Sequence, residues 1–485
     1  MNTTDSFLKE LEPLNLQKCY SVSDIVEAMS YCSFGARMLG ETTTKIYEWI
    51  VTNKAPIAIY DGNLDSPLGQ LLQEMSARKW FTKIVAPKDY TRPVFGGENA
   101  IVIGAYSESV AENIYSTPKE AIFLNQFAMV KPGQTTDGYF PNVIFSDPNF
   151  LLPVIFITLE ERLRDRKSSI TDLMKILAHY EGLAAEVSSG SQTLRAMIQD
   201  PDCLVFLTLS GAMTIAKMGL IICDLIDMKA VQAVCSTGAL MAHGLVESVG
   251  LKHFKYNPQK DDANLAKLKM NRVTDTLEPE DNLEHIKTIL DRILDEYTHL
   301  KPIGTRYFHQ IVGEHLAKEY SGQRGILKSA YEQNVPVIVP AFVDSEIGND
   351  IYIYNRMCEQ TGRSRIVFDL ELDTQYLVEM MTNVKKTGIF TVGGGVPRNY
   401  IQNLAPLVEL LNGYKDFNLP ERKLSYGCRI CPDPMHYGHL SGCSYSEGMS
   451  WRKMETRGMF SEVHADATLI LPFLVKFLME SRELT

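Results

Sequence analysis

The chain has 485 residues, of which 45% are hydrophobic and 22% charged, and its formal net charge is -11. This length predicts two domains, or one large domain with a sizeable extension. The acidic balance disfavours nucleic acid as a partner and favours cationic ligands, such as polyamines or a basic protein loop.

Two further features predict the compartment. The longest apolar runs, residues 150–159 and 469–478, are too short to span a bilayer, and the first residues lack a basic segment followed by an apolar core. Nine cysteines, an odd number spread along the chain, are typical of reduced thiols. We therefore expect a cytoplasmic protein without membrane contact or disulfides.

Short apolar runs rich in β-branched residues alternate with helical periods along most of the chain. An amphipathic helix is predicted at residues 283–297, where apolar residues recur at helical spacing. The alternation predicts an α/β fold: a Rossmann-like parallel sheet with flanking helices, preceded by a smaller α/β segment. The predicted strands are residues 57–60, 100–104, 204–207, 231–234, 337–339, 366–368 and 387–392.

A charged stretch at residues 163–169 predicts a domain boundary. On this interpretation residues 1–165 form an N-terminal α/β domain, and residues 166–485 form a larger domain.

A weak internal repeat crosses this boundary. Residues 23–60 align without gaps on residues 171–208, in helix pattern, small residues and closing strand. The apolar segment that starts at Ser146 also resembles the one that starts at Ala465, with proline at the same place. Either the N-terminal domain is a truncated, diverged copy of the larger one, or two apolar helices merely look alike.

The stretch around Gly393, Gly394 and Gly395 has the order strand, glycine turn, helix. Residues without side chains let a ligand approach the backbone, and the free amides of the following helix favour a negative group such as phosphate. A tight packing turn between buried elements has the same appearance. Two loops of small residues, 209–213 and 235–239, follow other predicted strands, and the carboxyl ends of parallel strands meet at one edge.

The segment Glu447 to Lys453, EGMSWRK, offers a nucleophile. A lysine forms an imine only when it is neutral, and the apolar ring of Trp451 and the like charge of Arg452 should lower the pKa of Lys453. Glu447 could hold a cationic amine and shuttle protons. Taken alone, both Lys453 and Glu447 are as well explained as solvated surface charges.

Eight short motifs, in order, resemble the deoxyhypusine synthase family, specifically its bacterial deoxyhypusine-synthase-like branch, from about Ser169 to the C-terminus. They are FLTLSGAMTIAKMG, CSTGALMAHGL, KMNRVTDTLEPED, RYFHQIV, PVIVPAFVDSEIGN, FTVGGGVPRN, YGHLSGCSYSEGMSWRKM and HADATLILPFLV. The resemblance implies that residues 166–485 form an NAD-binding catalytic domain. By the same resemblance, NAD lies against Ser210, Gly211, Ser236, Thr237, Gly238, Asp344, Gly393, Gly394, Gly395, Asp466 and Ala467.

The resemblance also implies a reaction. Family members use NAD to oxidise the carbon beside a secondary amine, pass an aminobutyl group from spermidine to an enzyme lysine, and hand it to an acceptor amine; the NADH formed earlier then reduces the final imine. Lys453 would be that lysine, with Glu447 and Trp451 as its catalytic neighbours. The resemblance further implies a homotetramer with its active site at a subunit interface.

The chain departs from the family where the donor amine would bind. Residues 240–244 read LMAHG where the family carries an acidic pair, and Leu440 replaces an aspartate. Fewer carboxylates should hold a polycation less tightly, which suggests a shorter diamine or a guanidino amine. The substrate-binding residues expected by alignment are Asn349, in place of an aspartate, Asn399, in place of a histidine, the retained Asn403, and His439, which aligns with a small polar residue.

One cluster, Cys428, Cys431, His436, His439 and Cys443, has the residue types and spacing of a zinc site. It overlaps the segment that the resemblance assigns to the nucleotide and the amine. We expect loop packing with free thiols rather than a metal.

Two functions are therefore weighed. The leading hypothesis is an NAD-dependent aminoalkyl transferase of polyamines, with a free amine or a lysine of a basic acceptor protein as acceptor. The alternative is a catalytically weak partner subunit that regulates an active paralogue, which the lost acidic pair favours. An ordinary nicotinamide dehydrogenase would leave Lys453 unexplained.

Overall fold

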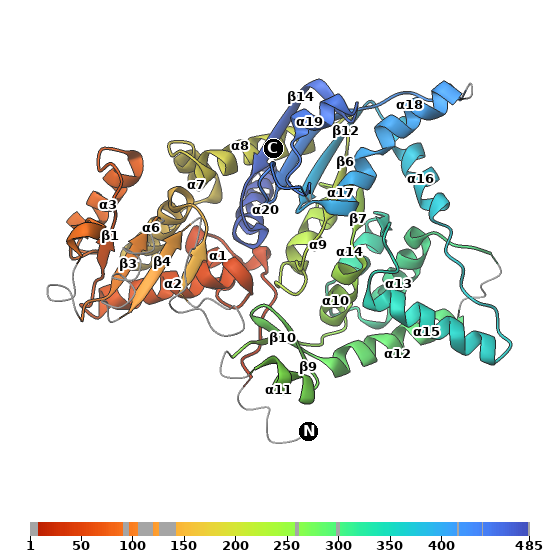
Figure 1. Cartoon of the computed structure of the whole chain (residues 1–485), viewed down its shortest axis with the longest axis horizontal. Coiled ribbons are helices and arrows are strands. Elements are labelled where there is room, and N and C mark those ends of the chain that lie inside the picture. Colours follow the sequence, from red (N-terminus) through yellow and green to blue (C-terminus); the bar gives the residue numbers. More distant parts are fainter. Residues whose placement is uncertain are drawn as a thin grey trace. The chain divides into compact units, whose positions relative to one another are not determined.

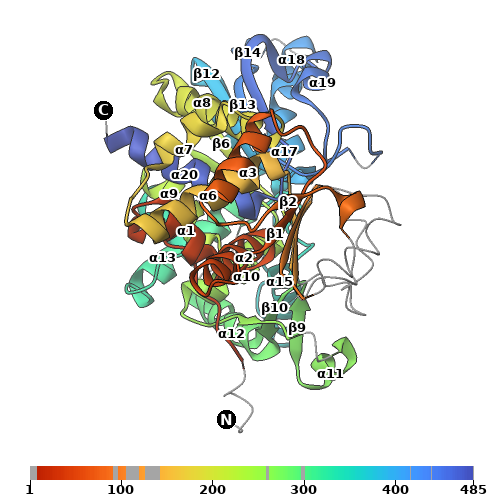
Figure 2. The same cartoon turned by 90° about the vertical axis from the view of Figure 1, so that its left-hand side faces the viewer.

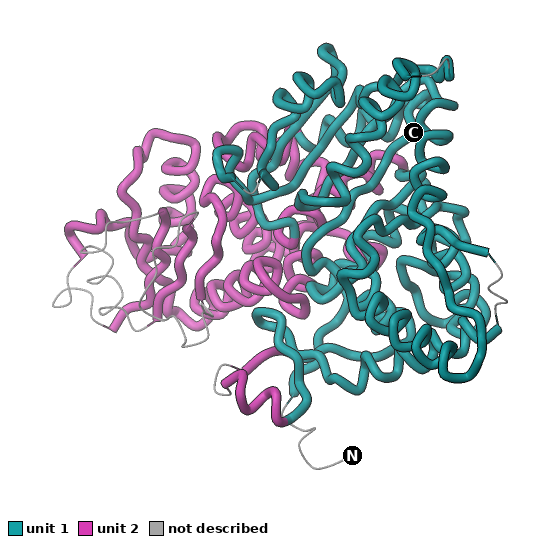
Figure 3. Tube along the Cα trace, turned by 45° about the vertical axis from the view of Figure 1, so that its right-hand side comes forward, with its two compact units in different colours: residues 1–13, 190–254, 268–467 teal, residues 14–189, 255–267, 468–485 magenta. Residues whose placement is uncertain are grey.

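The computed structural model describes residues 8–90, 97–104, 120–125, 142–257, 261–296, 301–414, 417–438 and 440–483 (Figure 1). The chain divides into two compact units (Figure 3). Unit 1 comprises residues 1–13, 190–254 and 268–467, and unit 2 comprises residues 14–189, 255–267 and 468–485. In the described part of the chain, no helix has the length and apolar character needed to cross a membrane.

Unit 1 is built on a six-stranded sheet with the order β11-β7-β6-β12-β13-β14, in which all neighbours are parallel. The central pair is long and apolar, because both faces of a parallel sheet are covered by helices. The strands are β6 (Cys203–Leu209), β7 (Ala233–Ser236), β11 (Val337–Ile338), β12 (Lys386–Val392), β13 (Leu424–Ile430) and β14 (Met454–Val463).

The core of unit 1 forms where helices cover this sheet. Phe206 and Ile389 of the central strands are fully buried and share a cluster with Leu377 and Val408 of two covering helices. The helices are α9 (Gly219–Asp227), α10 (Gly238–Ser248), α12 (Glu280–Glu296), α13 (Thr305–Glu319), α14 (Ile326–Glu332), α15 (Glu346–Gln360), α16 (Leu370–Thr382), α17 (Gly395–Gln402), α18 (Leu404–Tyr414) and α19 (Tyr445–Ser450). A small sheet, β8-β10-β9, is formed by Phe254–Lys255, Thr276–Pro279 and Met270–Val273.

Unit 2 contains a second, five-stranded sheet with the order β2-β1-β3-β4-β5, again parallel throughout. Its short strands are almost wholly apolar and buried. Helices α2, α3 and α6 pack against it (Figure 2). The elements are β1 (Ile57–Ile59), β2 (Ile84–Val85), β3 (Ala100–Ile103), β4 (Ala121–Asn125), β5 (Val143–Phe145), α1 (Val22–Met29), α2 (Phe34–Val51), α3 (Pro67–Ala77), α6 (Pro148–Arg164), α7 (Ile170–Leu177), α11 (Asp262–Lys267) and, shared with unit 1, α8 (Leu183–Gln199) and α20 (Ala467–Glu483).

The two sheets have the same strand order. In unit 2, strands β1 to β5 have the spatial order 2-1-3-4-5. If β6, β7, β12, β13 and β14 of unit 1 are numbered 1 to 5 along the chain, they have the same spatial order, and β11 is added at one edge. At the offset that aligns Ser23 with Thr171, helix α1 falls on α7 and α2 falls on α8. Helices α6 and α20 each contain an internal proline, Pro153 and Pro472.

One buried contact occurs in both halves of this pattern. Glu161 of α6 accepts hydrogen bonds from the backbone N–H of Ser23 in α1, at 2.8 Å, and of Ser168, at 2.9 Å. Glu480 of α20 accepts them from Ile170 and Thr171 in α7, at 2.9 and 2.8 Å. A carboxylate at the first turn of a helix satisfies amides that have no partner within that helix.

The α/β fold class, with the parallel sheet and its smaller N-terminal α/β segment, is confirmed. Residues 366–368 are not a strand, contrary to expectation; the segment makes only an isolated bridge from Phe368 to Ile303. Phe368 packs against Phe342 and Phe308 at ring distances of 4.5 and 5.8 Å, which explains its apolar character. Strand β7 begins at Ala233, two residues later than predicted.

The repeated glutamates allow a matched test of stability. Glu161→Ala and Glu480→Ala should each lower the free energy of unfolding of unit 2 by about 2 kcal/mol, because each leaves two backbone N–H groups without a partner. Urea titrations followed by circular dichroism would measure this. Glu181→Ala, at an exposed position, is the control, and a loss no larger than that of the control would show that these carboxylates do not hold the helices.

Candidate functional site

The centre of the unit 1 sheet is a topological switch point. After β6 the chain passes to β7 on one side of the sheet, whereas after β12 it passes to β13 on the other. The two connections diverge at the carboxyl ends of β6 and β12, and open α/β sheets bind ligands in the crevice that this leaves. Ser210 and Gly211 follow β6 there, and the three glycines follow β12.

Of the three consecutive glycines, Gly393 and Gly394 have a different structural role from Gly395. A side chain at Gly393 would meet Ser210 Oγ at 2.1 Å, and one at Gly394 would meet the carbonyl oxygen of Ser441 at 2.8 Å. Gly394 N–H also donates to Ser210 Oγ at 3.0 Å. These two glycines therefore allow close packing of neighbouring loops.

Gly395 and Gly211 instead present bare backbone. Both have positive φ, 65° and 77°, and an added Cβ at either would meet no atom within 4 Å. Helix α17 starts at Gly395, and no side chain caps its N-terminus. Its first amides are thus available to an anion, and this is the arrangement that binds phosphate in dinucleotide sites.

The β7–α10 turn lies against the loop that precedes α15. A Cβ at Gly238 would lie 2.5 Å from the side chain of Ser345. Thr237 caps α10 through its hydroxyl, at 3.4 Å from the amide of Leu240, and Ser236 is buried at the end of β7. Asp344 and Asn349, before and within the first turn of α15, are exposed at the same edge of the sheet.

The main chain of Lys453 does not lie at the carboxyl edge of the sheet. Its carbonyl oxygen accepts from the amide of Leu424, the first residue of β13, so its main chain stands at the amino end of that strand. Its side chain extends to α17, where Nζ donates to Asn399 Oδ1 at 2.8 Å. Nζ also lies 5.7 Å from the ring centroid of Trp451. Lys453 makes no hydrogen bond with any of the residues predicted to bind NAD.

The surroundings of Lys453 favour its neutral form. Burial lowers the pKa of the Lys453 ammonium; the cysteine Cys443 acts against this shift, and the positive charge of Arg398 adds to it. Arg398 is itself buried, with its guanidinium 5.2 Å from the ring centroid of Tyr445. A neutral lysine on a partly buried segment is what imine chemistry requires.

A buried arginine fixes the loop that leads to this lysine. Arg429 of β13 is only 1% exposed. Its guanidinium donates to the carbonyl oxygens of Ser441, Gly442 and Cys443, at 2.7 to 3.2 Å, and forms an ion pair with Glu462 of β14 at 2.9 Å. Residues 441–443 are therefore held to the sheet immediately before α19. Nothing in the sequence pattern marked Arg429 as part of the site.

The remaining predicted residues have varied positions. Glu447 is exposed in the first turn of α19, whose N-terminus Ser444 caps, and its side chain makes no hydrogen bond or ion pair with Lys453. Asn403 is exposed at the end of α17. Asp466 and Ala467 follow β14 at the carboxyl edge of the sheet. His439 lies outside the described residues.

Among the described residues, one group of at least three His, Cys, Asp or Glu side chains brings its ligand atoms within 4.8 Å of one another: His243, His253 and Glu278. Cys428, Cys431 and Cys443 are free thiols, and none belongs to this group. Burial raises the pKa of the Cys428 thiol to about 12.

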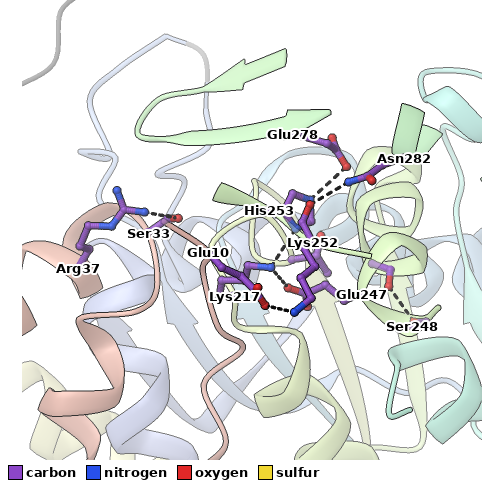
Figure 4. Close-up of polar contacts among 12 residues, drawn as sticks. Glu10, Ser33, Arg37, Lys217, Glu247, Ser248, Lys252, His253, Glu278 and Asn282 are labelled. Atoms are coloured by element: carbon purple, nitrogen blue, oxygen red, sulfur yellow. Dashed lines mark hydrogen bonds and ion pairs between the residues drawn. The ribbon is translucent and has the colours of Figure 1, made fainter. Parts of the chain in front are cut away.

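The His243 group was not predicted from the sequence. His243 lies in the segment 240–244, where this chain lacks the acidic pair of the family. Two carboxylates nevertheless lie beside it, Glu278 at 2.8 Å and Glu346 at 3.8 Å. His253 and Glu278 are completely or almost completely buried, and Lys217 and Glu247 extend the contacts inward (Figure 4). The residues come from separate elements, so no local motif could reveal the group.

A model of the deoxyhypusine synthase family matches residues 172–478, more than half of the chain. The chain belongs to the deoxyhypusine synthase family. A protein named probable deoxyhypusine synthase 2 from Archaeoglobus fulgidus is 32% identical over 286 residues, which cover 59% of this chain and 90% of that protein. A deoxyhypusine synthase-like protein from Chlorobaculum parvum is 28% identical over 320 residues, covering 65% and 88% of the two chains.

A solved structure assigned to deoxyhypusine synthase from Entamoeba histolytica is similar with a TM-score of 0.44 and 16% identity, over 65% of this chain and 95% of that one. Deoxyhypusine synthases are transferases, and the family typically uses NAD and polyamines. The residues present fit that cofactor: bare glycines, an uncapped helix N-terminus and small-residue turns meet at the switch point of the sheet.

Arg429 provides a test of how the site is held. Arg429→Met should lower the free energy of unfolding by about 3 kcal/mol, because it leaves the carbonyl oxygens of residues 441–443 without their donor and removes the ion pair with the partly buried Glu462. It should also make residues 431–444 more susceptible to limited proteolysis. Arg457→Met, on an exposed position of β14, is the matched control. If both variants unfold at the same denaturant concentration, Arg429 does not hold the loop.

Proposed function

We propose that the protein is an NAD-dependent aminoalkyl transferase that moves an aminobutyl-type group between amines through an imine on Lys453. The observation that carries the proposal is the state of Lys453: a partly buried side chain, oriented by Asn399 and with a lowered pKa, on a loop of a deoxyhypusine synthase fold. The acceptor is a free amine or the lysine of a basic protein.

The chain's own residues have distinct roles in this reaction. NAD, when bound, would take a hydride from the carbon beside the donor nitrogen, and the NADH so formed would return it to the imine of the final product. The neutral Nζ of Lys453 then attacks that carbon, the donor nitrogen leaves as an amine, and the acceptor amine later displaces Lys453 in the same way. Asn399 orients Nζ, Trp451 forms an apolar wall beside it, and Glu447 holds the substrate ammonium until its proton leaves.

The cofactor would be held at the carboxyl edge of the sheet. Backbone at Gly211 and Gly395 approaches the phosphates, with Ser210, Gly393 and Gly394 shaping the turn. The loops after β7 and β11 contribute Ser236, Thr237, Gly238 and Asp344, and Asp466 and Ala467 contribute from the end of β14. Asn349, Asn399, Asn403 and His439 are the proposed contacts of the amine.

We further propose a homotetramer whose active sites are shared between copies. Two observations support this: Lys453 makes no bond to the proposed NAD-binding residues of its own chain, and an open groove beside it is lined by apolar side chains, Leu410, Tyr414 and Trp451, that are 56%, 82% and 66% exposed. Groups of this kind on a protein surface mark interaction sites.

Complementation between two inactive variants tests the shared site. Gly395→Asp should block phosphate binding, and Lys453→Ala removes the nucleophile. Co-expression of the two in equal amounts should restore about a quarter of the wild-type activity, because about half of the subunit pairs are mixed and each mixed pair keeps one intact site of two. Inactive mixtures with a normal mass in light scattering would contradict a shared site, and a monomeric mass would contradict the tetramer.

Unit 2 is proposed to be a truncated, diverged copy of the catalytic domain that does not bind NAD. The equal strand order, the paired prolines and the paired glutamates support common origin. The sequence has no triple glycine after residues 100–104. NAD bound to this unit in a crystal structure would contradict the second part of the proposal.

The central experiment concerns Lys453. Lys453→Ala should lower transfer by a factor of about 1,000 or more, since loss of an essential nucleophile costs several orders of magnitude, while the thermal midpoint and NAD affinity stay nearly unchanged. Wild-type protein, NAD and a panel of polyamines would be incubated and new secondary amines measured by mass spectrometry. Borohydride added during turnover should trap the donor's carbon chain on the peptide that contains Lys453.

Lys385→Ala is the matched control, because this lysine is 76% exposed and directly precedes β12 at the amino end. Retained activity of Lys453→Ala, or no adduct, would refute covalent catalysis. Wild-type protein that is inactive alone with every amine, but raises the activity of a co-expressed paralogue, would instead favour the regulatory partner subunit.

A further inference from the structure

A chain of five polar side chains runs through the interior of unit 1, from Glu247 to His243. Lys217 Nζ forms an ion pair with Glu247 at 2.7 Å and contacts His253 Nδ1 at 2.9 Å. His253 Nε2 lies 3.1 Å from Glu278 Oε1, and Glu278 Oε2 lies 2.8 Å from His243 Nδ1. Lys217, His253 and Glu278 are each at most 1% exposed (Figure 4).

The donors and acceptors along this chain of side chains determine which ring nitrogens of His253 and His243 carry a hydrogen. The Lys217 ammonium can only donate, so His253 Nδ1 accepts and His253 Nε2 carries the hydrogen that it donates to Glu278. Glu278 presents its second oxygen to His243 Nδ1 at 2.8 Å, outside the angular range of a hydrogen bond; because a ring-nitrogen lone pair would repel a carboxylate oxygen at this distance, Nδ1 carries a hydrogen as well. His243 Nε2 is left with its lone pair and makes no hydrogen bond with the described residues.

The same order argues against a metal in the His243, His253 and Glu278 group. A metal on His253 Nε2 would require the hydrogen to sit on Nδ1, where it would oppose the N–H groups of Lys217 at 2.9 Å. The group therefore holds protons. It also orients the His243 ring from within, because Glu278 is fixed by His253 and His253 by Lys217.

The outer side of His243 faces the first turn of α15. Its Nε2 is 3.8 Å from Glu346 Oε1, too far for a hydrogen bond, and Glu346 Oε2 is buried without a partner. The close contact of Gly238 with Ser345 joins the start of α10 to the start of α15. A carboxylate with one unpartnered oxygen, on a side chain that is 38% exposed, thus stands beside an imidazole nitrogen with a free lone pair at the carboxyl edge of the sheet.

We infer that His243 and Glu346 form a subsite for a cationic amine: Glu346 pairs with the ammonium, and His243 Nε2 takes a proton from it. The inference rests on the proposed transferase function and names how the donor is made reactive. The step is a proton transfer, in which a secondary ammonium and a neutral imidazole become a neutral amine and an imidazolium. Only the neutral amine has the electron pair that assists hydride loss from the neighbouring carbon.

Several other charged groups lie around His243. Burial lowers the pKa of His243, but the contact with Glu278 and the charges of Glu278 and Glu346 outweigh it and raise the pKa above its ordinary value. Opposing its burial, the two histidines lower the pKa of Glu278 to about 2, so it stays ionised. On the helices that pack on α10, Lys328 of α14 is bound by carbonyl oxygens and Lys287 of α12 pairs with Asp291. Asp350 of α15 has a pKa raised to about 6 by its burial and by Asp291 and Glu346, against the charge of Lys287.

A cation held by Glu346 opposes the charge on the imidazolium, and this gives a test that does not depend on turnover. The full-length protein would be labelled with 13C-histidine, its ten histidines titrated by NMR, and the His243 signal assigned from the spectrum of His243→Gln. Without ligand the midpoint of His243 should lie above that of an ordinary histidine. Saturating spermidine or putrescine should lower that midpoint by about one unit at constant ionic strength.

The variants separate binding from structure. Glu346→Gln should lower the free midpoint of His243, remove its response to spermidine and weaken spermidine binding about tenfold in calorimetry, as expected for loss of a charge-assisted hydrogen bond. Glu332→Gln, at an exposed position of α14, should change neither. In an active enzyme, His243→Gln should remove the corresponding ionisation from the pH profile of amine-dependent NADH formation.

The outcomes also distinguish this inference from the proposed function. A spermidine response of His243 that persists in Lys453→Ala, or in a protein that transfers nothing, supports the amine subsite even where the transferase proposal fails. A His243 midpoint that neither amine moves overturns the subsite, whatever the activity. Stoichiometric zinc that survives purification and is lost in His243→Gln would overturn the argument from Lys217 and assign a metal instead.

Discussion

The parallel pairing of β6 with β12 is the constraint on which the site depends. The two strands match over seven residues, from Cys203 opposite Lys386 to Leu209 opposite Val392. One step before their ends, Thr208 donates to Thr391 at 2.9 Å within the core, so that both strands stop at the same level. Because their continuations lead to opposite sides of the sheet, the backbone beyond Leu209 and Val392 must open into a crevice.

Unit 1 also contains buried charges, at a cost that apolar packing would not impose. Desolvating a guanidinium or a carboxylate is expensive, and ion pairs inside proteins seldom add net stability. Arg429 and the Lys217 to Glu278 chain are nevertheless almost fully buried. Each of them fixes something that an apolar residue could not: Arg429 holds three carbonyl oxygens of one loop, and Lys217 selects the hydrogen positions of two imidazoles. Positioning, rather than stability, explains their presence.

Many of the strands whose burial is apolar were predicted from the sequence, although β2, β4 and β5 of unit 2, which are also apolar, were not. Strands β1, β3, β6 and β12 carry apolar runs between turn residues and were predicted to within a few residues. Strands β13 and β14 were missed because they contain Arg429, Glu455 and Arg457, and only the paired partner of Arg429 makes such a residue compatible with a central strand. Residues 366–368 were wrongly predicted to be a strand because they are apolar. In the structure, Phe368 packs in an aromatic cluster instead.

Some residues of the candidate site could likewise be predicted from the sequence, whereas the contacts between them could not. Local motifs indicated Lys453 and the glycine turn, because a turn or a nucleophile is a property of consecutive residues. The contact of Lys453 with Asn399, and that of His243 with Glu278 and Glu346, join residues far apart in the chain, and without an alignment no local pattern predicts them. Although the sequence lacks the acidic pair of the family, the fold still brings two carboxylates next to His243.

The repeated contacts of Glu161 and Glu480 suggest how a duplicated fold can diverge. In unit 2 each glutamate satisfies the first amides of a helix within its own half of the repeat. Asp147 of α6 reaches Leu183 at the start of α8, and Thr468 of α20 reaches Ala36 at the start of α2, so contacts also run across the halves. A residue that satisfies buried amides cannot be lost without destabilising its neighbours, whereas a glycine kept for a ligand can be lost once the ligand is gone. On the proposed common origin, the helix contacts should therefore persist longest and the phosphate turn should vanish first, which is the pattern that the N-terminal half presents.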